Sequence, residues 1–225
     1  MRLEKQRRSE NVEDRRSFTQ SAGFRIGGLG GLILVVAAVL FGLNPGQIRR
    51  LLGPQGGGGG PQQAMDSATK AEQDEAVVFV EKILASTEDV WTKRFQELGK
   101  PYQPPKLVVF SGEVTSACGR AVASMGPFYC PLDQTVYIDL SFYRDLAEKH
   151  NAPGDFAQAY VIAHEVGHHV QHLMGISDEV HRMQQQSSKA EGNRLSVCLE
   201  LQADFFAGVW AHHAEKDYDI LERGD

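Results

Sequence analysis

The fold is decided by residues 156–174, FAQAYVIAHEVGHHVQHLM. Asp155 is placed to cap the start of a helix there, and Gly175 follows where a helix would end. Within this stretch His164 and His168 stand among alanine, valine and glycine, so an ordinary solvated helix face does not account for them. Polar groups that are surrounded by apolar residues need partners. The stretch therefore predicts a helix that is largely apolar and carries a polar site.

The spacing of the two histidines indicates a metal site. Side chains four residues apart project from one face of a helix, one turn apart, so His164 and His168 can reach a single ion. Glu165 lies one step around the helix, where its carboxylate can take a proton from water at the metal without binding the metal itself. Hydrolytic zinc usually has three protein ligands and keeps one position for water, so a third ligand has to come from elsewhere.

Glu200 is the best candidate for that third ligand. In the extended HExxHxxGxxH pattern, Gln171 occupies the position of the glycine and Met174 that of the third histidine, which excludes a third histidine of that kind. Glu200 belongs to a stretch whose apolar periodicity predicts a helix over residues 191–214. Asp204, four residues on, shares its face and is expected to bond the outward nitrogen of His164. The alternative is that the two carboxylates form an acidic surface stripe.

Four further histidines receive plainer assignments: His169, His172, His212 and His213. His172 continues the spacing of the pair but lies about 12 Å along the helix axis from His164, too far to share one ion. The first two are therefore expected to be structural or surface residues. The last two stand near a helix end, where a favourable interaction with the helix dipole is the simplest role, and transition-state stabilisation by one of them is the alternative.

An apolar run of eighteen residues, Ile26–Leu43, contains no charge and no proline and is long enough to cross a bilayer. Seven Lys/Arg precede it, whereas only Arg49 and Arg50 follow closely. The positive-inside rule then predicts a single-pass protein of the cell inner membrane with a cytoplasmic N-terminus and a periplasmic or otherwise extracytoplasmic catalytic domain. A buried core helix and a cleavable signal peptide are the alternatives. The long leading segment and the lack of a small-x-small site disfavour cleavage.

Charge is unevenly distributed along the 225 residues. Nine Lys/Arg stand against four Asp/Glu through Arg50, and fourteen against twenty-five after it, which argues against nucleic acid as a partner of the acidic body. Five consecutive glycines between prolines indicate a flexible tether. The expected organisation is a basic cytoplasmic tail (1–25), a transmembrane anchor (26–43), a Gly/Pro/Gln-rich linker (44–66) and a globular domain (67–225).

Three cysteines have to be placed in a domain that is expected to meet an oxidising environment. Cys118 and Cys130 flank a short glycine-bearing stretch and are the expected disulfide. Cys198 falls within a helical pattern and is expected to be a buried free thiol. A cysteine-based zinc site is the alternative, which the lack of any C-x-x-C spacing disfavours.

The remaining elements suggest an α+β fold. A helix is expected over residues 69–98, and Leu107–Phe110 is a short apolar strand. Val136–Leu140 alternates as a half-exposed strand does, and as an exposed edge beside the metal it would hold an extended peptide by main-chain pairing. We therefore expect a small twisted sheet packed on the helix of residues 156–174, with a helical half that supplies Glu200.

Four motifs together resemble the "putative neutral zinc metallopeptidase" family of bacterial membranes: NVEDRR (11–16), GPFYCP (126–131), HEVGHHVQ (164–171) and LELQAD (199–204). This resemblance covers nearly the whole chain and implies a zincin-like fold. It also implies a metal set of His164, His168 and Glu200, as in the wider thermolysin-type group whose third ligand is a glutamate. By the same resemblance the family domain is expected to continue beyond Asp225.

These expectations converge on a zinc-dependent metalloendopeptidase that hydrolyses peptide bonds with Glu165 as general base. The implied cofactor is Zn²⁺, and the implied partners are a peptide or protein substrate and a membrane, reached through one helix. The alternative is a membrane-anchored scaffold or binding protein that zinc stabilises and that has no turnover. Glu165 favours the enzyme, because a structural zinc site needs no glutamate beside its first histidine and closes its fourth position with a protein ligand.

Overall fold

The computed structural model describes residues 1–16, 62–150 and 154–225. The predicted anchor, residues 26–43, and the predicted linker up to residue 61 lie outside the described residues. Among the helices that are described, none combines the length and the apolar character needed to cross a bilayer. By its internal contacts the chain divides into one unit of Met1–Ser17 with Gln73–Asp225, and a second unit of Phe18–Glu72.

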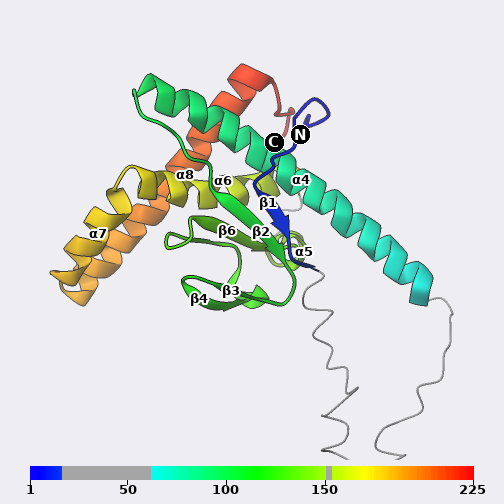
Figure 1. Cartoon of the computed structure of the whole chain (residues 1–225), viewed down its shortest axis with the longest axis horizontal. Helices are drawn as coiled ribbons and strands as arrows, with labels where there is room; N and C mark the ends of the chain where they lie inside the picture. The colour runs from blue at the N-terminus through cyan, green and yellow to red at the C-terminus, as the bar shows by residue number, and fades with distance from the viewer. Residues whose placement is uncertain (17–61, 151–153) are drawn as a thin grey trace, which may run out of the picture. The chain divides into compact units, whose positions relative to one another are not determined.

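The first unit mixes helices and strands, which is the α+β class predicted from the sequence (Figure 1). Labels follow Figure 1, and the described elements, in chain order, are β1 (Val12–Asp14), α4 (Gln62–Glu97), β2 (Lys106–Phe110), β3 (Glu113–Ser116), β4 (Gly119–Val122), the 3₁₀ helix η1 (Ala123–Met125), β5 (Phe128–Cys130), β6 (Thr135–Asp139), α5 (Ser141–His150), α6 (Asp155–Leu173), α7 (Ile176–Gln185) and α8 (Lys189–Tyr218).

The sheet beside the candidate site has four strands in the order β1-β2-β6-β5. β1, β2 and β6 run parallel, and β5 is antiparallel to β6. β2 and β6 are buried almost throughout, as is usual for parallel strands covered on both faces. β5 is an edge strand, so the sheet ends at the strand that lies closest to α6.

The assignment of Val136–Leu140 as a half-exposed edge strand is wrong. β6 lies between β2 and β5, and all five of its residues are buried. Its polar groups have internal partners: the Tyr137 hydroxyl donates to the Asp133 carboxylate at 2.8 Å. The Asp139 carboxylate accepts hydrogen bonds from the backbone N–H groups of Gly112 (2.6 Å) and Ser141 (2.8 Å). The alternation in the sequence reflects polar groups with buried partners rather than a solvent-facing side.

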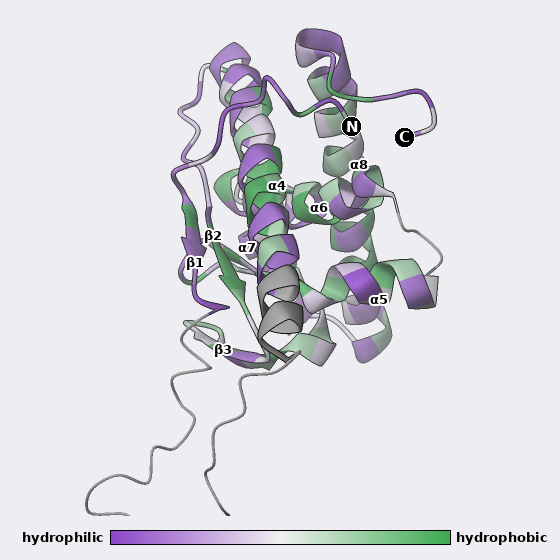
Figure 2. Ribbon diagram, turned by 90° about the vertical axis from the view of Figure 1, so that its right-hand side faces the viewer, coloured by the Kyte–Doolittle hydropathy of each residue, from purple (hydrophilic) through white to green (hydrophobic). Residues whose placement is uncertain are grey.

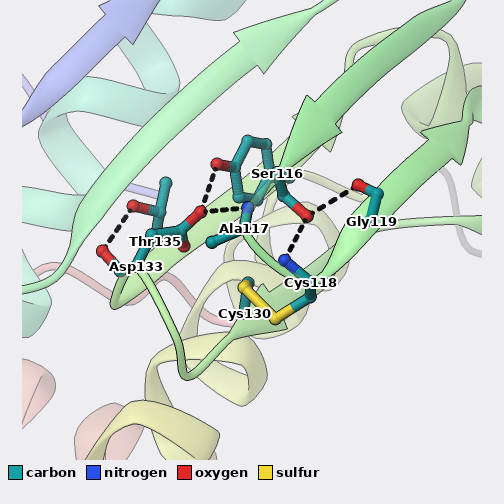
Figure 3. Close-up of a disulfide and its surroundings, with 8 residues drawn as sticks. Ser116, Ala117, Cys118, Gly119, Cys130, Asp133 and Thr135 are labelled. Atoms are coloured by element: carbon teal, nitrogen blue, oxygen red, sulfur yellow. Dashed lines mark hydrogen bonds between the residues drawn. A yellow bond between two sulfur atoms is a disulfide. The ribbon is translucent and has the colours of Figure 1, made fainter.

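A disulfide joins the turn of the β3–β4 hairpin to the end of β5. It links Cys118 to Cys130, the pair selected from the sequence (Figure 3). Asp133 supports the same turn, because its carboxylate accepts a hydrogen bond from the backbone N–H of Ala117 at 2.9 Å. Cys198 is free, as expected, but the expectation that it is buried is wrong, because the thiol is exposed. The buried side of α8 is formed instead by Ala203, Ala207, Trp210 and Ala214.

Two helix starts also differ from the expected ones. Gly154, not Asp155, is the N-cap of α6, and no side chain caps this helix. The Asp155 carboxylate instead accepts a hydrogen bond from the amino terminus of Met1. α8 begins earlier than residue 191, because the Ser188 side chain caps it by accepting a hydrogen bond from the backbone N–H of Glu191.

α6 and α8 cross in very close contact at one glycine. A Cβ atom at Gly167 would lie 2.9 Å from the carbonyl oxygen of Ala203 and 3.1 Å from its Cα. Real side chains do not tolerate such distances to backbone atoms, so only glycine permits this approach. The crossing lies between the two histidines of α6 and opposite the segment of α8 that carries Glu200 and Asp204. It therefore sets the distance between the two halves of the candidate site.

Residues 1–16 are part of the folded unit, which departs from the expected start of the domain near residue 67. Val12, Glu13 and Asp14 of β1 pair in register with Leu107, Val108 and Val109 of β2. Figure 2 shows the hydrophobic β2, in green, directly beside the mostly hydrophilic β1. An edge strand with charged side chains carries little local hydrophobic pattern, so this pairing has no clear sequence signature.

Candidate metal centre

Three potential ligands converge between α6 and α8: His164, His168 and Glu200. One ligand atom from each lies within 4.8 Å of the others. The Glu200 Oε2 atom is 3.3 Å from the Nε2 atom of His164 and 3.5 Å from that of His168. Among the described residues this is the one group of three or more histidine, cysteine or acidic side chains with such geometry.

The chemistry of these donors fits zinc. Two imidazoles and one carboxylate form the set that leaves a fourth position open in hydrolytic zinc sites. Each imidazole has its Nδ1 atom occupied by a protein partner, so the Nε2 atoms of His164 and His168 are left to face Glu200. Calcium and magnesium are disfavoured, because they prefer oxygen ligands alone.

His164 is oriented by Asp204. Its Nδ1 atom lies 2.9 Å from the Asp204 carboxylate, and a metal at Nε2 requires the proton to be on Nδ1, which then donates. The Tyr160 hydroxyl donates to the same carboxylate oxygen at 3.0 Å. Partial burial, followed by this contact with Asp204, raises the pKa of Tyr160 to about 12. Asp204 thus lies where the sequence analysis expected it, and Tyr160 joins it from one turn earlier on α6.

His168 is oriented by Gln171, a role that was not expected from the sequence. The Nδ1 atom of His168 lies 3.0 Å from the amide oxygen of Gln171. The amide nitrogen of Gln171 donates to the backbone carbonyl of Leu199 (2.7 Å) and to the side chain of Gln202 (3.1 Å). Gln171 is fully buried. One sequence feature could have indicated this role: Gln171 is a polar residue three positions after His168, on the apolar side of the helix.

Glu165 is buried beside the ligands, with 8% of its surface exposed. Burial raises the pKa of its carboxyl group above the usual range, and the neighbouring His168 and His164 oppose that shift. A smaller interaction with the backbone of Tyr129 in β5 also lowers this pKa. Glu165 therefore lies between the candidate ligands and the edge strand of the sheet.

His169 has a structural role, as expected. Its Nε2 atom donates to the backbone carbonyl of Gln103 at 2.7 Å, which leaves Nδ1 to accept from the Tyr129 hydroxyl at 2.9 Å. Burial lowers the pKa of His169 to about 4, so the ring is neutral near pH 7. This hydrogen-bonded chain fixes Tyr129, and with it β5, against α6.

The other histidines do not contribute to the ligand group. The ring of His172 lies 6.4 Å from that of Tyr129, which agrees with a packing role. His213 lies at the distal half of α8, where its ring is within 3.4 Å of the Arg94 guanidinium. Neither His212 nor His213 lines the cleft at the metal centre, so transition-state stabilisation by either is not supported.

A cleft of about 440 Å³ contains the candidate metal centre. Its lining comes from the loop and strand around β5 and from the helices α6, α7 and α8. Neutral side chains predominate, and the only formal carboxylates are Glu165 and Glu200. The lining residues are Pro127, Phe128, Tyr129, Pro131, His164, Glu165, His168, Gln171, Ser177, Gln184, Ser196, Leu199 and Glu200.

A helix with HExxH, a glutamate from a second helix and an edge strand at one cleft define the general class of metal-dependent hydrolases. The family comparison is more specific. The "putative neutral zinc metallopeptidase" model matches residues 1–225, and the chain belongs to that family.

Curated relatives are consistent with this membership. The chain is 49% identical over 231 residues to an uncharacterized protein of Escherichia coli K12, YpfJ, and the alignment covers 100% of this chain and 79% of the relative. It is 46% identical over 114 residues to an uncharacterized protein of Mycobacterium tuberculosis H37Rv, Rv2575, covering 50% of this chain and 37% of the relative. No solved structure matches the chain.

Proposed function

We propose that this chain is a zinc metallopeptidase that cleaves peptide bonds within protein or peptide substrates. The observation that carries the proposal is the convergence of His164, His168 and Glu200 with the Glu165 carboxylate at one cleft. Membership of the family supports zinc and hydrolase chemistry at this site. The endopeptidase activity and the role of each residue are inferred from the arrangement of the side chains.

His164, His168 and Glu200 would hold the ion. Bound zinc supplies Lewis acidity, which polarises a peptide carbonyl and makes water acidic enough to lose a proton near neutral pH. Asp204 and Gln171 keep the two imidazoles in the tautomer that presents Nε2 and limit their rotation. The protein thus supplies preorganised ligands rather than groups that must move into place.

Glu165 would carry the proton. Its carboxylate takes a proton from the attacking water as the oxygen adds to the scissile carbonyl carbon. It then delivers that proton to the departing amine nitrogen as the C–N bond breaks, so one water is consumed and no proton is gained or lost by the enzyme. Burial raises the carboxyl pKa, which brings its proton affinity closer to what this exchange near neutral pH requires.

The substrate would lie along the outer edge of β5. This strand replaces Val136–Leu140 as the candidate for main-chain pairing, because β6 is internal to the sheet. Phe128, Tyr129 and Glu165 line the same cleft, so an extended peptide on this edge would pass the base. Main-chain pairing alone imposes little side-chain preference, which favours broad specificity.

Two variants of the full chain test this proposal. Glu165→Gln removes the base while keeping the size of the side chain, so peptide cleavage should fall by about 10²- to 10⁴-fold with zinc content unchanged. Glu200→Gln should lower zinc affinity, whereas Glu191→Gln, at an exposed position on the same helix, should change neither property. Zinc is measured by metal analysis and cleavage by mass spectrometry of a peptide-library digest.

If the chain is instead a zinc-binding scaffold, neither the parent protein nor its variants should show zinc-dependent peptide cleavage. If the zinc-loaded parent cleaves nothing in a broad library, or if Glu165→Gln cleaves as fast as the parent, the chain is a zinc-binding protein without turnover and the proposal fails.

A further inference from the structure

The N-terminal segment, residues 1–16, is integrated into the same folded unit as residues 73–225. Figures 1 and 2 both show it running beside α4 and entering the sheet as β1. Backbone hydrogen bonds hold it at both ends of β1: the Leu107 N–H donates to the Asn11 carbonyl at 2.9 Å, and the Arg15 N–H donates to the Val109 carbonyl at 2.7 Å. Leu3 is also buried within the main hydrophobic core.

A buried carboxylate on α4 depends on this segment. Glu88 is only 4% exposed, and three side chains of the N-terminal segment donate hydrogen bonds to it: Ser9 (2.5 Å), Arg7 (2.7 Å) and Asn11 (2.8 Å). A buried carboxylate without its donors is strongly destabilising. Glu88 therefore indicates that the unit folds with residues 7–11 in place.

Four of the six basic residues of the segment are paired with acids elsewhere in the same unit. Arg2 contacts Asp219 at 2.6 Å, Arg7 contacts Asp89 at 2.7 Å, and Arg16 contacts Asp74 at 2.7 Å. Arg8 is likewise paired with Glu81. The positive-inside rule counts positive charges that flank a membrane segment in short loops. Here these four arginines are engaged in ion pairs of a folded domain, so their charges are a poor guide to the orientation of the chain.

We propose that residues 1–16 and residues 73–225 lie on the same side of the membrane. Strands that share direct hydrogen bonds cannot form across a hydrocarbon layer of about 30 Å. This proposal replaces the arrangement expected from the sequence, in which the N-terminal segment and the larger part lie on opposite sides of the membrane. The Cys118–Cys130 disulfide points to the oxidising, extracytoplasmic side for both parts. This inference does not depend on peptidase activity.

A thiol-labelling experiment on the full chain in intact spheroplasts tests the inference. Cys198 is exposed and free, so the parent protein already carries a probe for the larger part. A second protein carries Cys198→Ser together with Lys5→Cys, because Lys5 is exposed in the N-terminal segment. A membrane-impermeant maleimide is added before or after lysis, and the labelled fraction is compared. A Cys198→Ser protein without the new thiol gives the background.

Both thiols should be labelled to a similar extent before lysis. Labelling of Cys198 with protection of the Lys5→Cys thiol until lysis would place the two parts on opposite sides and overturn the inference. Protection of both would overturn the extracytoplasmic assignment.

As a second measurement, Glu88→Gln should destabilise the detergent-purified full chain more than Glu97→Gln does, because Glu97 is exposed on the same helix. Equal stabilities would mean that residues 7–11 are not docked on Glu88.

Discussion

The two histidines of the candidate metal centre are supported by partners of different character. Asp204, which holds His164, has a side chain that is 47% exposed. Gln171, which holds His168, is fully buried and also bonds the backbone of α8. One support is a charged group open to water, and the other is a neutral group enclosed between two helices.

Because of this difference, substitutions at Gln171 and at Asp204 should affect zinc affinity and the stability of the metal-free fold to different extents. Water can replace a contact that is lost at an exposed carboxylate, whereas a buried donor or acceptor without its partner keeps the full desolvation penalty. We therefore expect changes on the Gln171 side to weaken both the metal-free fold and zinc binding. Changes on the Asp204 side should weaken zinc binding and leave the metal-free fold nearly unaltered.

The largest effect is expected from Gly167→Ala, which disturbs both supports at once. The new Cβ would meet the Ala203 backbone at 2.9 Å, so α6 and α8 must separate. Overpacking of this kind costs about 1–3 kcal/mol of unfolding free energy. The shift moves Glu200 away from the histidines, so zinc affinity should fall as well. Denaturant unfolding of the metal-free protein and competitive zinc titration measure the two effects.

Gly208→Ala is the matched control for this substitution. Gly208 lies on α8 with open space around its Cα, and alanine in an exposed helix position should raise stability by about 0.5–1 kcal/mol. If Gly167→Ala behaves like this control, the close crossing does not set the site geometry.

Gln171→Leu should have the next largest effect. It leaves the Nδ1 proton of His168 and the carbonyl of Leu199 without their partner in a buried place. The metal-free protein should lose about 1–3 kcal/mol of stability, and zinc affinity should fall about 10- to 100-fold. The same unfolding and titration experiments apply. A loss of affinity with unchanged metal-free stability would remove the distinction between the buried and the exposed support.

Helical spacing explains why part of this site was predictable. His164, Glu165 and His168 lie within five residues of one helix, and Glu200 with Asp204 within five residues of another, so local periodicity places each group on one face. The contact between the two helices could only be postulated. That contact depends on Gly167, which lies against the backbone of Ala203, a residue 36 positions later in the chain.

Long-range pairing explains what sequence reasoning missed. β1 joins β2 across more than ninety residues, and β5 rather than β6 forms the sheet edge, yet neither choice leaves a local pattern. Tyr129 and Gln171 look like ordinary polar residues in their own segments. Their roles appear only when β5 is placed on α6 and α6 on α8.

Asp204→Asn should affect the metal without affecting the fold. The amide keeps the shape of the side chain and an oxygen for the His164 Nδ1 proton, but it removes the negative charge that strengthens this contact. Zinc affinity should fall about tenfold, and the metal-free protein should unfold at nearly the same denaturant concentration as the parent. Destabilisation of the metal-free protein by as much as Gln171→Leu would contradict the proposed difference between the two supports.

The smallest effect is expected from Tyr160→Phe, which removes one hydrogen bond to Asp204 and leaves the His164 contact in place. A net contribution of about 1 kcal/mol for such a bond corresponds to about a fivefold change in zinc affinity, and water at this exposed position should reduce it further. If Tyr160 acts only through Asp204, the double variant Tyr160→Phe, Asp204→Asn should bind zinc with the same affinity as Asp204→Asn alone. In a double-mutant cycle, effects on zinc affinity that do not add show that the two residues act on the metal through the same contact. A loss of peptide cleavage much greater than the loss of zinc affinity would instead show that the Tyr160 hydroxyl acts on the substrate.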